Sequence, residues 1–374
     1  MFELTNAQRS CFGLLPVEPG WIRMELKPSP YDRHTTVAYL DGTVIRKYIE
    51  TGDLLYTEYE ICEQLSDDLR YLLPKTQKGK PVLLSAATLK KRNGFGMALS
   101  YSRERSDRAH ICLFSHTSQR NYYSNYYDPQ DPGEESDIRQ WAEKWCAETT
   151  REDLADIVRF AAQPRQHCRF REGDVFLFQI GRRLYGYGRI LLDYAQMRKK
   201  KEPFWDILMG KPLACSVYHI VTQRQDVTVA ELKDLPSLPS VHIMDNRFYY
   251  GEHRIIGNIP IGEQEDYPIL YGSSIRIGEK AELLQCGKLY RRKEDSNDLF
   301  KGAFSNHAIG FNLKVNLPVL RSCIKAGSNQ PYWLQNNWTT NQDLRNPKFR
   351  AELEAVCRRF QLSPEQLIKS EHTN

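Results

Sequence analysis

The stretch that decides the fold reads GDVFLFQIGRRLYGYGRILL and spans residues 173–192. Two apolar runs, 176–180 and 184–190, flank the polar tripeptide Gly181-Arg182-Arg183. Runs rich in aromatic and branched residues are typical of strands, and a short segment with glycine between two of them is typical of a hairpin turn. The stretch therefore predicts a β-hairpin with a three-residue loop.

The register of this hairpin brings glycines opposite phenylalanines. With the loop at 181–183, Phe178 faces Gly186 and Phe176 faces Gly188. An aromatic ring that covers a bare glycine stabilises the strand, while the glycine lets the backbone curve strongly. We therefore expect a curved antiparallel sheet or an open small barrel around the hairpin.

A wider pattern extends from the hairpin. Gly173 and Asp174 open the first strand, and YGYGRIL forms the second. Further apolar or proline-containing segments follow in the order 213–221, 235–239, 255–260 and 267–268. This ordered pattern, over about residues 170–270, resembles the immunity protein 26 family of bacterial polymorphic-toxin and contact-dependent growth inhibition systems.

The resemblance implies a protein that binds and neutralises a cognate toxin C-terminal domain, without catalysis and without a cofactor. If the toxin is a nuclease, its substrate cleft is basic, and acidic residues on the immunity protein would match it. Each such acid is also consistent with a solvated turn. The loop with Phe204 and Trp205 either folds back onto the sheet or meets the partner. The candidate toxin-binding residues are Asp245, Glu252, Glu263, Glu265, Asp266, Phe204 and Trp205.

Length and composition set the limits for the rest of the chain. At 374 residues the chain is too long for one ordinary core, so we expect two or three domains. A hydrophobic content of 41% is enough for packed interiors. The net charge of +5 is close to balance, so the chain as a whole has little attraction for nucleic acid or anionic lipid.

The cysteines and the N-terminal sequence favour a cytoplasmic protein. The nine cysteines are scattered and never spaced as CxxC, which disfavours both a disulfide framework and a zinc cluster. The chain does not open on a basic-then-apolar signal segment, and no run approaches the ~20 apolar residues of a membrane span. We therefore expect no metal, no cofactor and no membrane partner.

Residues 1–165 predict an α+β domain, whose role the sequence leaves open. Asp41-Gly42 lies between two apolar runs, and both residues tolerate positive φ, so a hairpin turn is expected there. Ser85 precedes a run of helix formers and predicts a capped helix at 86–92.

Two helices are expected to end this domain. Ile138, Trp141 and Trp145 form one apolar stripe of the first helix. Thr150, with an acidic residue three positions later, predicts a capping box at the start of the second helix. The buried face of the second helix is expected to carry Leu154, Ile157, Val158 and Ala161.

The second domain, 166–280, starts with the hairpin. Asp245-Asn246 is expected to form a turn between strands, and Thr228 is expected to start a short helix. Several short strands with one brief helix predict a curved antiparallel sheet or an open small barrel. The further strands are expected at 213–221, 241–244, 247–251 and 254–259.

Residues 281–374 predict a mixed extension that ends in helices, so the overall class is α+β. A strand is expected at 309–315. Asn346-Pro347 combines an N-cap residue with proline at the first helical position, which predicts a helix at 347–360. Ser363 precedes a second helix at 364–370.

Two other functions remain open at this point. The tyrosine cluster 122–127 and the basic loop 198–201 suggest a nucleic-acid-binding module as the alternative, because bases stack on aromatic rings and lysines bind phosphates. A hydrolase is the other possibility, but the sequence has no GxSxG, HExxH or P-loop motif and its histidines are dispersed. We therefore predict no catalytic residue. The identity of the toxin, its contact surface and the oligomeric state are not determined by the sequence.

Overall fold

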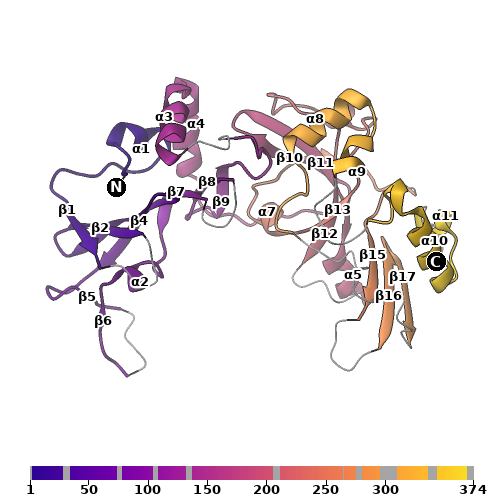
Figure 1. The fold of residues 1–374 in the computed structure, drawn as a ribbon, viewed down its shortest axis with the longest axis horizontal. Coiled ribbons are helices and arrows are strands. Elements are labelled where there is room, and N and C mark those ends of the chain that lie inside the picture. Colours follow the sequence, from indigo (N-terminus) through magenta and orange to yellow (C-terminus); the bar gives the residue numbers. More distant parts are fainter. Residues whose placement is uncertain are drawn as a thin grey trace. The chain divides into compact units, whose positions relative to one another are not determined.

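The chain folds into two compact units, Met1–Gln166 and His167–Asn374, in a computed structural model (Figure 1). Each unit contains its own clusters of buried hydrophobic side chains, and each is described below by itself. The structure describes residues 2–27, 34–73, 78–103, 108–131, 137–204, 211–263, 265–274, 280–294, 310–335 and 343–368.

Unit 1 is built on a seven-stranded antiparallel sheet with the strand order β1-β2-β3-β4-β7-β8-β9. Strands that are adjacent in the sheet are therefore close in sequence. Both faces of the sheet carry buried hydrophobic clusters. The strands are β1 (Ile22–Leu26), β2 (Thr35–Asp41), β3 (Val44–Thr51), β4 (Leu55–Gln64), β7 (Phe95–Ser102), β8 (His110–Ser115) and β9 (Arg120–Ser124).

The predicted hairpin near Asp41 is confirmed, with its turn shifted by one residue. Asp41 pairs with Val44, so Gly42 and Thr43 form the turn. Gly42 has a φ of +58°, a conformation that glycine adopts without steric cost. The register also shifts between Tyr39 and Leu40, which indicates a bulge.

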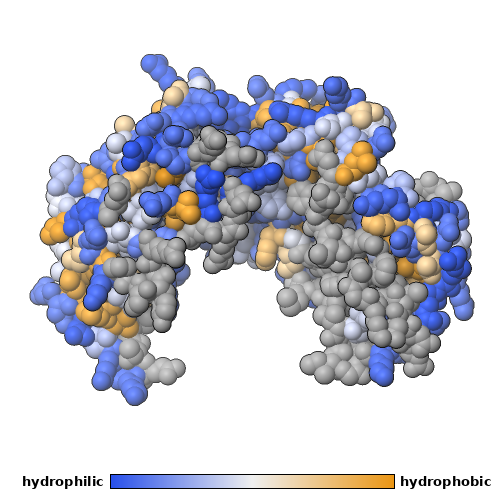
Figure 2. Space-filling view, in the orientation of Figure 1, coloured by the Kyte–Doolittle hydropathy of each residue, from blue (hydrophilic) through white to orange (hydrophobic). Residues whose placement is uncertain are grey.

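A smaller two-stranded sheet accompanies the large one in unit 1. β5 (Arg70–Tyr71) pairs with β6 (Val82–Leu83), and the described residues 69–73 and 78–84 are called the β5–β6 arm here. Tyr71 and Leu84 of the arm are buried in the cluster on the second face of the large sheet. Figure 2 shows hydrophobic residues gathered at the surface around β5 and β6.

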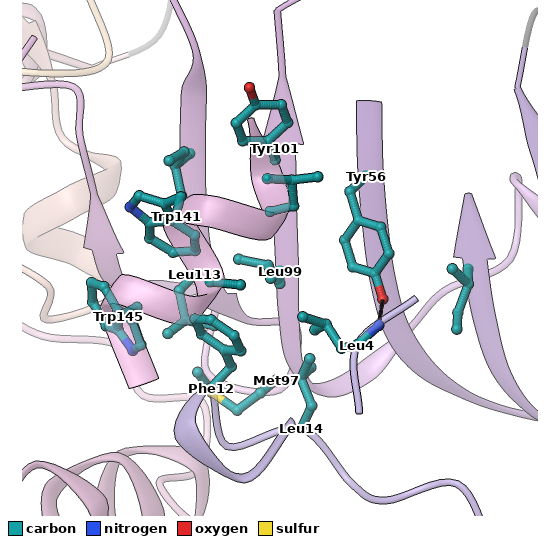
Figure 3. Packing of buried hydrophobic residues seen from close by; sticks show 14 of the residues in the cluster. Leu4, Phe12, Leu14, Tyr56, Met97, Leu99, Tyr101, Leu113, Trp141 and Trp145 are labelled. Carbon is teal, nitrogen blue, oxygen red and sulfur yellow. Dashed lines mark hydrogen bonds between the residues drawn. The ribbon is translucent and has the colours of Figure 1, made fainter. Parts of the chain in front are cut away.

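Helices α1 (Asn6–Cys11) and α3 (Ile138–Ala147) contribute to the core on the first face of the sheet. The Phe12 ring stacks on Trp141 and Trp145, with centroids 5.5 and 5.9 Å apart (Figure 3). Ile138 is buried with them, which confirms the predicted stripe. On the second face, α2 (Ala86–Leu89) is capped by Ser85 as predicted but ends before residue 92.

The last helix of unit 1 is α4 (Arg151–Ala161), which Thr150 begins with the predicted capping box. The prediction of its buried face was wrong for two residues, because Leu154 is 37% and Val158 64% exposed. Ile157 alone is fully buried, close to Gly13, with Phe160 and Ala161 half-buried. The buried face of α4 is therefore narrower than the apolar face that its sequence predicts.

A buried ion network joins α1 to the sheet and was not predicted. Glu58 accepts hydrogen bonds from Arg9 Nε (2.7 Å) and pairs with Lys47 Nζ (2.8 Å), which also donates to Glu60 (3.0 Å). These four side chains are at most 5% exposed. Two positive and two negative charges compensate one another, as a protein interior requires. Burial nevertheless raises the pKa of Glu60 above its ordinary value, against the opposing effect of Lys47.

Unit 2 contains two antiparallel sheets that stay open within the described residues. The larger sheet has the order β13-β12-β11-β10-β14, and the smaller has the order β15-β16-β17. The predicted α+β class, with open antiparallel sheets and C-terminal helices, is confirmed. The strands are β10 (Asp174–Gly181), β11 (Leu184–Asp193), β12 (Pro212–Val217), β13 (Val241–Met244), β14 (Arg254–Asn258), β15 (Ile269–Ser273), β16 (Ala281–Cys286) and β17 (Leu289–Glu294).

Short helices connect and cover these strands. The predicted start of a helix at Thr228 is confirmed, since its side chain and that of Glu231 form a capping box. The helices are α5 (Tyr194–Lys200), α6 (Val229–Leu232), α7 (Asn246–Tyr249), α8 (Leu317–Ala326), α9 (Gln330–Gln335), α10 (Arg350–Phe360) and α11 (Pro364–Ile368), with a 3₁₀ turn at Pro347–Phe349 before α10.

Two strand predictions in unit 2 were wrong. Residues 247–251 were expected to follow a turn as a strand, but α7 forms there because the amides of Phe248 and Tyr249 bond to the Asp245 carbonyl. This places the Phe248 ring in the core, 4.9 Å from Phe176. The strand expected at 309–315 is represented by a single bridge between Gly310 and Ile243, and residue 309 lies outside the described residues.

The C-terminal helix forms as expected, although its first turn is 3₁₀ rather than α. Asn346 caps it through its side chain, and the apolar stripe of α10 is buried. This stripe packs in one cluster with residues of β11, α5, β15 and β16. β15 and β16 pair across the expected domain boundary at 280, so that boundary falls inside a sheet. The predicted end of the last helix, 369–370, lies outside the described residues.

Candidate partner-binding surface

The β10–β11 hairpin is the scaffold on which the candidate surface rests. Phe176 pairs with Gly188 and Phe178 with Gly186, so the predicted register is confirmed. A Cβ atom added to Gly186 would lie 2.6 Å from Phe178 Cζ, which shows how closely the ring covers the glycine. The turn differs from the prediction, because Gly181 pairs with Leu184 and a bulge precedes it.

Aromatic side chains fix the inner side of this hairpin. The His253 ring stacks on Phe176 at 5.4 Å and meets Phe178 and Phe248 edge-on at 5.8 and 5.0 Å. His253 is 2% exposed, and neither ring nitrogen has a hydrogen-bond partner. Burial, with a smaller effect from Arg247, lowers the pKa of His253 to about 3. A neutral imidazole thus serves here as a flat aromatic spacer.

The acidic segment between β14 and β15 is held onto the fold by its own carboxylates. Glu265 is ion-paired with Arg189 of β11 and accepts a hydrogen bond from the Gly262 amide at 2.8 Å. Asp266 accepts hydrogen bonds from the Ser240 amide and from the Arg345 guanidinium, both at 2.8 Å, yet its side chain is 46% exposed. Glu263 is exposed. Two of these three candidate acids therefore have structural partners.

The other two candidate acids flank α7. Glu252 is ion-paired with Arg247, whose Nε also donates to Asn312 Oδ1 at 3.0 Å. Asp245 is nearly buried, and burial raises the pKa of its carboxyl while Lys211 opposes this effect. Arg247 thus compensates the charge of Glu252, and burial leaves little of Asp245 accessible to a partner.

The aromatic pair in the following loop behaves as core where it can be followed. Phe204 packs at the edge of the main hydrophobic cluster of unit 2, with the Arg198 guanidinium 5.5 Å from its ring centroid. The sequence predicted that this loop either folds back onto the sheet or meets the partner. For Phe204 the structure shows that it folds back. Trp205 lies outside the described residues.

The features proposed for nucleic-acid binding are used mostly inside the fold. Tyr123 and Tyr127 are 2% and 7% exposed, and Tyr123 packs on Trp145 with centroids 4.9 Å apart. Tyr126 is 38% exposed. The basic run 198–201 forms the end of α5. The tyrosines therefore do not offer consecutive rings to a strand of bases.

The sequence did not reveal the cluster around Arg345. Its guanidinium donates to Asp343 (2.7 Å), Asp266 (2.8 Å) and the Ser240 carbonyl (2.7 Å), and its side chain is 7% exposed. This cluster ties the start of the C-terminal helices to β13 and to the acidic segment. Ser240 and Asp266 are 105 and 79 residues away in sequence, so no local pattern marks Arg345 for burial.

The described residues include neither a group of metal ligands nor a membrane-spanning helix. Among them, no three His, Cys, Asp or Glu side chains lie close enough together to hold a metal ion. No helix in this part of the chain is long and apolar enough to cross a bilayer.

The comparison with protein families concerns a segment that is less than a third of the chain. Residues 171–283, which run from the start of the hairpin into β16, match the family model Immunity protein 26. The resemblance of this segment to the immunity protein 26 family is confirmed. The match contains all four hairpin positions of the aromatic–glycine pairs and every candidate toxin-binding residue. No curated protein and no solved structure matches the chain.

Proposed function

We propose that this protein is a bacterial immunity protein that binds and neutralises a cognate toxin C-terminal domain in the cytoplasm, without catalysis of its own. The match of residues 171–283 to immunity protein 26 carries the proposal. The family description supports an immunity role in general terms. The delivery of the toxin by a polymorphic-toxin or contact-dependent growth inhibition system belongs to the proposal.

The architecture of unit 2 supports a binding role. Neutralisation by binding needs a surface that changes little when the partner arrives, since ordering costs subtract from affinity. The ion pair of Arg189 on β11 with Glu265 and the buried Arg345 cluster, which binds Asp266, both hold the acidic segment 261–268 on the fold. We therefore propose that the toxin contacts the exposed residues of this segment, which include Glu263 and Asp266.

The charge of this segment bears on the class of toxin. If the toxin is a nuclease with a basic cleft, Glu263 and the exposed side of Asp266 are the acids best placed to meet it. Glu252 and Glu265 are already compensated by Arg247 and Arg189. Fewer carboxylates are therefore available to bind the basic cleft of a nuclease than the sequence suggested.

Co-expression tests the proposal directly. The first step asks whether a large secreted protein with a C-terminal toxin domain is encoded next to this chain. If so, we expect the full chain to rescue growth from that domain and to copurify with it. An unrelated toxin domain serves as the control for specificity. Glu263→Lys, on the exposed part of the segment, should weaken copurification, while Glu294→Lys on β17 should not. Killing that continues at full expression of the chain, with no copurification, contradicts the proposal.

A further inference from the structure

The β5–β6 arm of unit 1 lies in a stretch of sequence whose charged residues are all basic. Residues 69–103 contain no Asp or Glu, although the whole chain is close to charge balance. The stretch carries the basic residues Arg70, Lys75, Lys78, Lys80, Lys90, Lys91, Arg92 and Arg103. Of these, Arg70, Lys78, Lys80, Lys90 and Lys91 are exposed in the structure, and Arg70 and Lys90 are ion-paired with Asp68 and Glu50.

The outer face of the arm is apolar. Side chains alternate along a strand, so Tyr71 and Leu84 point inward while Leu72 and Leu83 point outward. Leu72, Leu73 and Leu83 are 50%, 72% and 54% exposed. Figure 2 shows this hydrophobic surface around β5 and β6. Single exposed leucines are ordinary, but a group of them on one small sheet marks an interaction surface.

The arm is fastened to the body of unit 1 and presents these leucines in a fixed position. The Arg92 guanidinium lies 3.8 Å above the centroid of the Tyr71 ring and donates to the Leu73 carbonyl at 3.2 Å. The Leu72 amide bonds to the carbonyl of Gln64 on β4 at 3.4 Å. A surface that is ordered before binding loses less entropy on binding.

We infer that the β5–β6 arm is a second toxin contact, which binds an apolar patch rimmed by carboxylates on the toxin domain. The leucines would form the dry centre of the contact, and Lys78, Lys80 and Lys91 would face the acidic rim. This inference rests on the proposed function. It assigns unit 1, which lies outside the family match, a role in choosing the partner.

The chemistry of the arm favours protein over the two other anionic partners. Single-stranded nucleic acid binds by stacking on aromatic rings, but Tyr71 is 1% exposed and lies beneath Arg92. Three leucines give at most marginal anchoring in a bilayer, which normally requires a longer apolar face or a second signal. A protein surface of matching shape can contact both the exposed leucines and the lysines beside them.

The test compares arm variants with matched controls in the full chain. Binding to the purified cognate toxin domain is measured by calorimetry for wild type, for Leu72→Ser with Leu83→Ser, and for Lys78→Glu with Lys80→Glu. The controls are Leu334→Ser, at a leucine on α9 that is 75% exposed, and Lys233→Glu. Urea unfolding confirms that each variant folds. We expect at least tenfold weaker binding for both arm variants, a reduced salt dependence for the lysine variant, and no change for the controls.

Each outcome separates the arm from the proposed function. Equal affinity of wild type and arm variants overturns the role of the arm and leaves the proposed function standing. Absence of wild-type binding overturns both. Binding of wild type, but not of the leucine variant, to phosphatidylserine vesicles with no effect on toxin affinity assigns the arm to a membrane surface and overturns the protein contact.

Discussion

The ring of Phe178 lies on Gly186, and this contact alone explains why residue 186 is glycine. The backbone of Gly186 does not have a positive φ, so an alanine would suffer no conformational strain there. The obstacle is the ring itself, which leaves no room for a methyl group. The same relationship holds between Phe176 and Gly188, so the two pairs form one layer on the hairpin.

Gly186→Ala should destabilise unit 2 by about 1–3 kcal/mol, because the Phe178 ring must move to admit the methyl group. Gly181→Ala is the control, since its nearest neighbour, Leu184 Cβ, would be 3.4 Å away, an ordinary contact. Hydrogen–deuterium exchange of the β10 and β11 amides measures both. A double variant with Phe178→Ala should lose less than the two single variants combined. Equal exchange in Gly186→Ala and Gly181→Ala would refute the role of the ring.

His253→Phe should make unit 2 less sensitive to acid. The pKa of His253 is about 3 in the folded state and about 6.5 in an unfolded chain. As the pH falls below 6.5, the unfolded chain takes up a proton that the folded protein rejects, so stability is lost progressively down to about pH 3. Between pH 7 and 4.5 the wild type should lose about 2 kcal/mol more than the variant, measured by urea unfolding. His242, whose pKa burial also lowers to about 3, contributes equally to both proteins. The same pH dependence in both would contradict the burial of a neutral His253.

Arg345→Met should cost unit 2 about 3–5 kcal/mol, because it leaves Asp266 and Asp343 without their buried cation. The C-terminal helices should then become the first site of limited proteolysis. Arg350→Met provides the matched control, since its ion pair with Glu354 is solvent-exposed and should contribute at most about 1 kcal/mol. If both variants resist protease equally, the cluster does not fasten the C-terminal helices.

Lys47→Met should destabilise unit 1 by about 3–5 kcal/mol and leave unit 2 unchanged. Lys47 is fully buried between Glu58 and Glu60, and its loss leaves more negative than positive charge in the interior. Arg46→Met on the same strand removes an exposed pair with Asp41 and should cost at most about 1 kcal/mol. Exchange of the β3 and β4 amides reports the effect. Parallel losses in the β10 and β11 amides would show that the two units do not unfold independently.

The confirmed predictions depended on residues that lie within a few positions of one another in the sequence. The caps at Ser85, Thr150, Thr228 and Asn346 were visible because a side chain satisfies a backbone amide two or three residues away. The hairpin register was visible because pairing in a short hairpin follows from its turn. In each case the sequence within a few positions contains both partners of the interaction.

The predictions that failed depended on partners far away in sequence. Val158 has the right spacing for a buried face, but the core of unit 1 has room only for the Ile157 side of α4. The acids of the segment 261–268 look like a binding patch in sequence, yet Arg189 and Arg345 use two of them to hold the fold together. A local pattern shows that a side chain is available but not which distant group will take it.

The sequence by itself determined the hairpin with its aromatic–glycine layer, the α+β class, the resemblance to immunity protein 26 and most helix starts, because short-range hydrogen bonds and residue periodicity encode these. Only the tertiary structure decided which carboxylates remain free, which apolar side chains stay at the surface and how the C-terminal helices are fastened. The physical reason is that burial and charge compensation depend on contacts between segments that the chain brings together only when it folds.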